Sequence, residues 1–339
     1  MSTLQVEGIK NAAATSDAIT LATNSTASAN LSNYGRKNWI VNGSFEVHQR
    51  GDTTHSYSWC GDRFQHRTGS SAAIAQSSTV PAGFNKSMSL TASSGTLALA
   101  WNTVLEVGNN LSGTAIGGFY ANNTKWTVSI WSTQPVKVRV DFTDGFGPTN
   151  PQAIVAAYTN MTSTGETSNG FTRYKHTFDI GSVNPVGTSK GLHIGWSLVT
   201  AAADVKFTGA QLEKGEYCGP YQHLSYGEYL AQCQRYYYKT PRSGYYVGAG
   251  NGTTNMNHTQ FTFPVAMRAQ PSGMNAVNVL VVTDSNYTSA SSKTPTIGSW
   301  HETGAHLNWS GVSGTTDNRI GAIMLNGSSA RVIFDSEFG

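Results

Sequence analysis

The stretch that decides the fold is residues 203–238, ADVKFTGAQLEKGEYCGPYQHLSYGEYLAQCQRYYY. In its first part Val205 and Phe207 alternate with polar residues, which is the period of a β-strand with one buried face. Gly209 then permits a bend before the strand continues. The second part changes to helical spacing, so the stretch predicts the last strand of one domain followed by a helix.

The predicted helix has both a start signal and a stop signal. Ser225 and Glu228 fit a capping box, in which each side chain accepts a hydrogen bond from the backbone N–H of the other residue. Pro241 prevents the helix from continuing. We therefore predict a linking helix over residues 223–241. The apolar stripe predicted for it consists of Tyr229, Leu230, Cys233, Tyr236 and Tyr237.

Composition favours an all-β protein with about two domains. The chain has 339 residues, which is enough for two hydrophobic cores. Charged residues make up 12%, against roughly 25% in ordinary soluble proteins, and there are 36 glycines. A chain that depends on Ser, Thr and Asn for its surface and turns this often is typical of β-sandwiches.

The same numbers exclude several partners. The net charge of +3 comes from scattered Lys and Arg without a basic run, so we expect no nucleic-acid partner. No apolar stretch approaches the roughly 20 residues that span a bilayer, and the start lacks the pattern of a signal peptide, so we expect no membrane insertion. Cys60, Cys218 and Cys233 fit neither a disulfide framework nor a metal pair. We expect reduced thiols in a protein assembled in a cytoplasm, with Cys233 buried on the helix stripe.

Four segments follow from these patterns. Residues 1–36 carry too little apolar surface for a core of their own, so they are either an unordered leader or a segment that orders on copies of itself or on another protein. Residues 37–222 hold eight or more alternating strands and predict a two-sheet jelly-roll sandwich. The linking helix at 223–241 leads to a smaller β-sandwich at 242–339, in which 283–316 is expected to form long loops.

Alternation also predicts which side chains are buried in the first sandwich. Each strand is expected to have one buried face and one solvated face, and Trp126, Phe142 and Trp196 lie on the buried side. Weaker patterns surround Ile74 and Met88. The clearest alternating runs are 126–130, 136–142, 174–180 and 192–198.

Catalytic and metal-binding patterns are mostly missing from the sequence. His301 and His306 are five residues apart with Gly304 between them, so they would not share a helix face in the way a zinc motif requires. We interpret them, with Glu302, as exposed loop residues. No metal and no cofactor are predicted.

Glycan cleavage needs two carboxyl groups about 5 to 9 Å apart. Asp141 with Asp144, and Asp335 with Glu337, are expected to be solvated edges instead. Asp62 and Arg63 are interpreted as a structural ion pair. We therefore predict no enzymatic activity, and a glycan-cleaving enzyme is the least favoured alternative. 

Aromatic residues give the stronger chemical signal. Sugars stack on Trp and Tyr rings while neighbouring amides and hydroxyls contact the rim. Four aromatic residues lie in polar stretches bordered by Gly and are predicted to contact a glycan, or alternatively to pack under loops or at a subunit interface. They are Tyr245, Tyr246, Trp300 and Trp309.

The chain resembles tail fibres and related appendage proteins of bacteriophages. The resemblance is carried by AQLEKG at 210–215, SYGE at 225–228, CQRYY at 233–237 and FPVAMRAQP at 263–271. NWIVNGSFE at 38–46 is similar to the first strand of jelly-roll carbohydrate-binding modules. Together these segments touch most of the chain from residue 38 onward.

In such modules a Glu at position 46 and a carboxylate on the last strand often hold calcium, but this chain has Gln211 where the second acid would be. For this reason no ion is predicted near Glu46.

The resemblance implies a virion protein, assembled in the host cytoplasm, that forms a homotrimer. Its N-terminal segment, which begins with Leu4, Val6 and Ile9, would attach it to another virion protein. Its β domains would bind a host cell-surface glycan without covalent chemistry. The alternative is a purely structural head-decoration or tail-connector protein without receptor contact.

Overall fold

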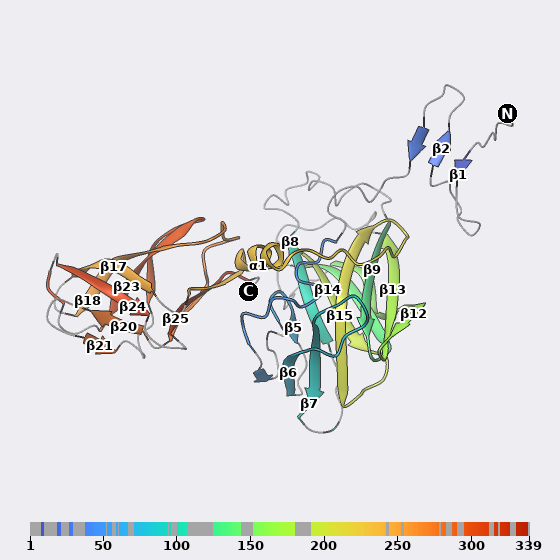
Figure 1. The fold of residues 1–339 in the computed structure, drawn as a ribbon, viewed down its shortest axis with the longest axis horizontal. Coiled ribbons are helices and arrows are strands. Elements are labelled where there is room, and N and C mark those ends of the chain that lie inside the picture. Colours follow the sequence, from blue (N-terminus) through green and yellow to red (C-terminus); the bar gives the residue numbers. More distant parts are fainter. Residues whose placement is uncertain are drawn as a thin grey trace.

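The computed structural model describes residues 8–9, 19–21, 27–29, 38–51, 53–55, 59, 61–66, 71–93, 95, 100–106, 125–143, 152–179, 191–241, 244–251, 254–277, 279–282, 287–289, 295–311, 315–317, 319–325 and 330–337. Figure 1 shows a large sandwich, a second and smaller sandwich, and the helix α1 between them. Among the residues described, no helix has the length and apolar content needed to cross a bilayer.

Three short strands in the N-terminal segment form an antiparallel sheet in the order β1-β2-β3. They are β1 (Gly8–Ile9), β2 (Ile19–Leu21) and β3 (Ala27–Ala29). Ile9 pairs with Ile19, so the two apolar patterns of the sequence lie in neighbouring strands. Attachment and trimerisation through this segment remain predictions.

The first sandwich is a jelly-roll fold of two antiparallel sheets, as the sequence predicts. One sheet has the order β11-β10-β14-β8-β5 and the other β12-β13-β9-β15-β7-β6-β4. Their strands are β4 (Thr53–His55), β5 (Gln65–His66), β6 (Ala72–Ser77), β7 (Ser87–Ala92), β8 (Ala100–Glu106), β9 (Lys125–Ser132), β10 (Val136–Thr143), β11 (Gln152–Asn160), β12 (Thr162–Ser168), β13 (Phe171–Asp179), β14 (Gly191–Leu198) and β15 (Asp204–Lys214).

The core of the first sandwich confirms the predicted inward faces. Trp126, Phe142 and Trp196 are fully buried. The predicted solvated faces are partly wrong, because Thr127 and Ser129 on β9 are buried as well. Thr127 Oγ1 donates to the carbonyl of Gly215, so the chain that follows β15 covers the outward side of this sheet.

Residues 38–46 fasten the opening of the domain to β15. Asn38 Nδ2 donates to the carbonyl oxygen of Ala210, and Asn38 Oδ1 accepts from the N–H of Leu212. A Cβ atom at Gly43 would collide with the Ala210 carbonyl, so this approach requires glycine.

Gln211 performs a role that a carboxylate could not. Its amide nitrogen lies 3.4 Å from the Gly219 carbonyl oxygen and 3.3 Å from that of Pro220, and its amide oxygen accepts from the N–H of Gln222 at 2.8 Å. A carboxylate has no donor for the two carbonyls. The amide at this position therefore fastens the segment that leads to the helix.

Helix α1 (Tyr226–Gln234) begins with the predicted capping box between Ser225 and Glu228. Cys233 is buried, as predicted, and burial raises the pKa of its thiol. Cys218 is also a free thiol, whereas Cys60 lies outside the described residues.

The predicted helix is too long at its end. Arg235 caps the helix, and Tyr237 starts strand β16 (Tyr237–Lys239). Tyr237 pairs with Asp335, so the aromatic residues at the end of the predicted stripe take part in a sheet. The long-range strand pairing competes with the local helical spacing, and aromatic residues favour strands.

The second sandwich packs a three-stranded sheet, β16-β25-β19, with a seven-stranded sheet, β21-β20-β24-β17-β18-β23-β22. The prediction of long loops over 283–316 is wrong, since three strands lie there. In β22 and β23 the outward residues include Ser, Thr, Asn and His, so the sequence resembles that of a polar loop. The strands after β16 are β17 (Gly244–Asn251), β18 (Asn255–Thr262), β19 (Gly273–Val277), β20 (Val279–Val282), β21 (Tyr287–Ser289), β22 (Thr296–His301), β23 (Gly304–Ser310), β24 (Ile320–Leu325) and β25 (Arg331–Asp335).

Ion pairs join the end of the second sandwich to the first. Arg50 pairs with Asp335 at 2.9 Å, and Arg63 pairs with Glu337. Glu337 is only 6% exposed, so the expectation of a solvated edge is wrong for it, whereas Asp335 is half-buried. The neighbours Asp62 and Arg63 also have different partners, because Asp62 accepts from Gln49 Nε2 at 2.7 Å. The sequence could not show that Arg63 meets a carboxylate 274 positions later.

Candidate functional site

A row of residues crosses the outward face of the five-stranded sheet. In register across four strands are Arg139 on β10, Gly195 on β14, Asn102 on β8 and Gln65 on β5. Neighbouring positions such as Ile194 point into the core, and successive side chains in a strand alternate between faces. The row therefore lies on the side of the sheet away from the core.

Asp141 and His193 form a dyad in the next row of the same face. His193 Nδ1 lies 3.2 Å from Asp141 Oδ2, and Arg139 Nε donates to the Asp141 oxygens at 3.0 and 2.8 Å. Asp141 is fully buried, so the prediction of a solvated edge is wrong for it. Asp144 lies outside the described residues. Because Nδ1 faces the carboxylate, Nε2 is the imidazole nitrogen left to contact another group.

Gly195 lets three polar groups converge over the sheet in the space that a side chain would take. A Cβ atom at this position would lie 2.7 Å from Asn102 Oδ1, 3.1 Å from His193 Cε1 and 3.2 Å from the Tyr158 hydroxyl oxygen. The missing side chain is thus replaced by the polar edges of Asn102, His193 and Tyr158. We call this group, with Asp141, the Gly195 pocket.

Two polar atoms of the Gly195 pocket have no hydrogen-bond partner in the described chain. They are His193 Nε2 and Asn102 Oδ1, on residues that are 4% and 2% exposed. Leaving a buried polar group unpaired costs about 1–3 kcal/mol. A ligand that supplies hydroxyl groups to both atoms would recover part of that cost.

The predicted aromatic contacts do not assemble into one surface. Trp309 is 1% exposed in the second core, so the prediction that its ring meets a glycan is wrong. Tyr246 stacks on Phe261 with ring centroids 4.0 Å apart, and Trp300 packs against the same core. Tyr245 on β17 is 71% exposed. Alternation along β17 explains why Tyr245 and Tyr246 differ in exposure, because adjacent side chains of a strand point to opposite faces. Of the four aromatic residues, Tyr245 is the one whose side chain is largely exposed.

His301 and His306 lie on the hairpin of β22 and β23, not on a helix. Among the described residues, no three His, Cys, Asp or Glu side chains are grouped to hold a metal ion. Glu46 accepts a hydrogen bond from Asn85 Nδ2 at 3.3 Å.

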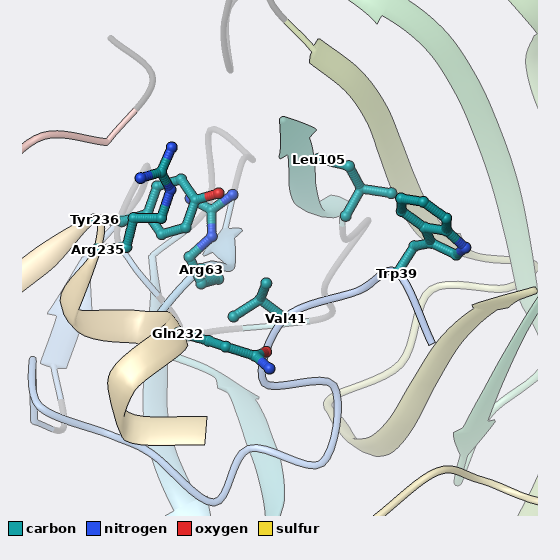
Figure 2. Close-up of a pocket in the computed structure, with 7 residues that line it drawn as sticks. All are labelled: Trp39, Val41, Arg63, Leu105, Gln232, Arg235 and Tyr236. Atoms are coloured by element: carbon teal, nitrogen blue, oxygen red, sulfur yellow. The ribbon is translucent and has the colours of Figure 1, made fainter. Parts of the chain in front are cut away.

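A small cavity lies where α1 meets the first sandwich. Figure 2 shows it between Gln232 and Arg235 on the helix side and Trp39 and Val41 on the sandwich side. Its volume is about 170 Å³. Ligand pockets for small molecules usually occupy about 300–1,000 Å³. We therefore assign it no ligand.

The sequence contained part of the signal for the Gly195 pocket. His193 and Gly195 stand on the polar side of an alternating run, which predicts that they face away from the core. Nothing in the order of residues places Asn102 or Tyr158 beside them. Sheet registration brings these residues together, and a single sequence does not specify which strands pair.

Comparison with known proteins gives similarity at the level of solved structures. No family model matches the chain, and no curated protein sequence matches it. The xylan-binding CBM22-1 domain of Paenibacillus barcinonensis Xyn10C is 13% identical, with a TM-score of 0.30, over 54% of this chain and 100% of that one. An apo form cyclase from Fischerella is 11% identical, with a TM-score of 0.31, over 54% and 98%.

The enzymatically active domain of tailspike protein 4 from bacteriophage CBA120 is also similar. It is 13% identical, with a TM-score of 0.30, over 52% of this chain and 21% of that one.

Proposed function

We propose that this chain is a non-enzymatic carbohydrate-binding protein of a bacteriophage appendage, and that the Gly195 pocket contacts sugar hydroxyls. The observation that carries the proposal is the pair of buried, unpartnered atoms His193 Nε2 and Asn102 Oδ1 above Gly195. A sugar ring offers neighbouring hydroxyl groups that donate to both atoms. The Tyr158 hydroxyl supplies a third polar contact, which would fix the orientation of the ring.

The dyad favours binding over cleavage. Glycoside hydrolysis uses two carboxyl groups, one of which gives a proton to the leaving oxygen. The carboxylate oxygens of Asp141 instead form hydrogen bonds with Arg139 Nε and His193 Nδ1. It therefore orients the imidazole and is not free to act on a bound sugar.

The assignment to a phage appendage rests on the resemblance of residues 210–237 and 263–271 to tail-fibre proteins. In this proposal the segment 1–36 attaches the protein to another virion component as a trimer, and the sandwiches face the host surface. Imaging of the particle with this protein labelled is expected to place it on the tail. A position on the head would overturn this part of the proposal.

Binding is tested with the full chain by calorimetry against neutral oligosaccharides released from host surface polysaccharide. His193→Ala and Asn102→Ala are each expected to weaken binding about tenfold, which corresponds to about 1.4 kcal/mol. Gly195→Ala places a methyl group among the three polar edges and is expected to weaken binding at least as much.

The matched control is Asn160→Ala, an exposed Asn at the end of β11 in the same sheet. It is expected to bind like the unmodified protein. Equal affinity of all four variants, or no binding by the unmodified protein to any host glycan, would overturn the role of the Gly195 pocket.

A further inference from the structure

A second candidate surface, which combines polar and apolar side chains, lies on the other sandwich at the edge of its seven-stranded sheet. Strands β18, β23 and β22 lie side by side there and surround a hollow of about 490 Å³. Strands β18 and β23 are labelled in Figure 1 at the end of the molecule far from the N-terminal strands. The polar residues that line the hollow are Gln260, Thr262, Ser299, His301, Thr303 and His306.

The register of the three strands brings these side chains next to one another. Gln260 pairs with His306, which pairs with Ser299, so three polar side chains stand in one row across the sheet. The adjacent inward row contains Phe261 and Ala305, which are buried in the core. Phe261, Trp300 and Ala305 line the hollow as well, so its walls combine outward polar side chains with apolar groups of the core.

Gly304 also lines the hollow. It stands between Thr262 and His301 in the next outward row. A Cβ atom at Gly304 would lie 2.6 Å from the carbonyl oxygen of Phe261, so a larger residue would disturb the strand pairing. Gly304, which is half-buried, therefore contributes only backbone to the lining.

The hairpin that borders the hollow is fixed in place by the rest of the domain. The N–H groups of Phe263 and Met267 donate to the carbonyl oxygens of Thr303 and Glu302, each at 2.9 Å. His301 Nδ1 also lies 3.1 Å from Thr303 Oγ1. A binding surface that is already ordered loses less conformational entropy when a ligand arrives.

The chemistry of the lining selects the class of ligand. Amide, hydroxyl and imidazole groups can donate and accept hydrogen bonds, whereas the lining includes no Lys or Arg to hold a phosphate or sulfate. The exposed carboxylate of Glu302, at the turn, further disfavours anions. The volume falls within the usual range of ligand sites.

From this geometry we infer that the hollow of β18, β22 and β23 is a second carbohydrate site, which binds neutral sugars through Gln260, Ser299 and His306. It is independent of the Gly195 pocket, since it lies on another sheet of another sandwich. Two sites on one chain can bind one polysaccharide at two points. The combined affinity then exceeds that of either site alone, because the second binding event is intramolecular.

The test uses the full chain carrying both His193→Ala and Asn102→Ala, so that the hollow is measured without the first site. Binding to a neutral oligosaccharide series is expected to persist in this variant. Adding Ser299→Tyr, which fills the hollow, is expected to reduce the remaining affinity at least tenfold. Adding Gln260→Ala with His306→Ala is expected to give a similar loss while leaving the hollow open.

The matched control is Thr296→Tyr, the same bulky ring at an exposed position of the same strand outside the hollow. It is expected to leave the remaining binding unchanged, and a thermal melt of each variant confirms folding. Loss of all binding in the double variant of the first site would overturn the second site while supporting the first. Unchanged binding in every variant would overturn both.

A sulfated glycan series and an extended peptide are measured in parallel. The peptide matters because β22 ends the described sheet and offers a backbone edge. Preferential binding of either probe at the hollow, blocked by Ser299→Tyr, would overturn the assignment to neutral sugars.

Discussion

Both sandwiches place polar side chains on the outward face of a sheet, but these side chains are buried in the first sandwich and exposed in the second. In the first sandwich Asp141, His193 and Asn102 face outward and are nevertheless buried, so their hydrogen bonds depend on what lies next to them. In the second, Gln260 and Ser299 face outward and are exposed, so solvent or a ligand satisfies them. Strand alternation decides which face a residue takes, and the surrounding chain decides whether that face is covered.

The largest expected effect is the difference in the free energy of unfolding between a substitution on an inward face and one on an outward face of the second sandwich. Trp309→Ala removes a fully buried ring and is expected to lower the free energy of unfolding by about 3–5 kcal/mol. Tyr245→Ala, on the outward face of β17, is expected to change it by less than about 0.5 kcal/mol. Denaturant unfolding followed by Trp fluorescence and circular dichroism measures both. Similar losses for the two variants would show that the face assignments are wrong.

The next test concerns the ion pairs that join the two sandwiches. Glu337→Gln removes the carboxylate that pairs with the buried Arg63, which is expected to cost about 3 kcal/mol, near the lower limit for breaking a buried pair because the amide still accepts a hydrogen bond. The second sandwich is expected to unfold at a lower denaturant concentration than in the unmodified protein.

Glu302→Gln is the control for that substitution, because Glu302 is exposed in the hairpin turn. It is expected to shift the midpoint by less than the error of the measurement. A midpoint for Glu337→Gln that matches this control would mean that the buried pair contributes nothing to the junction.

The smallest effect is a pH dependence within the first sandwich. Burial lowers the pKa of His176 on β13 below its usual 6.5. Between that lowered pKa and pH 6.5 the unfolded chain binds a proton that the folded protein does not, so stability falls as the pH is lowered through this window. Below the lowered pKa both states are protonated and the loss stops growing.

His176→Gln is expected to reduce this slope in unfolding experiments between pH 7.5 and 5.5. Part of the slope is expected to remain, because burial also lowers the pKa of His223, against an opposing effect of Glu46. An unchanged slope in His176→Gln would contradict the assignment of the pH dependence to this residue.

Much of the fold could be predicted because its signals are local. The period of two in β10 and β14 and the capping box at Ser225 each depend on residues a few positions apart, and the structure confirms them. The helix end was wrong because Tyr237 pairs with Asp335, almost a hundred positions away, and that pairing outweighs the helical spacing.

The sites could be predicted only in part, for the same reason. The polar, Gly-bordered sequence around Trp300 and Trp309 predicts loops, yet both rings pack inward from strands whose outward residues are polar. The Gly195 pocket needs β8, β10, β11 and β14 to be neighbours. A single sequence shows each strand's faces but not its neighbours, so His193 and Asn102 could not be placed together.

The distance along the chain between Arg63 and Glu337 also bears on how the protein is made. Arg63 leaves the ribosome 274 residues before its partner. At about 5–20 residues per second, that delay is roughly 14–55 s. Until then the Glu337 carboxylate is missing from the junction, so this contact between the two halves forms only after residue 337 has been synthesised.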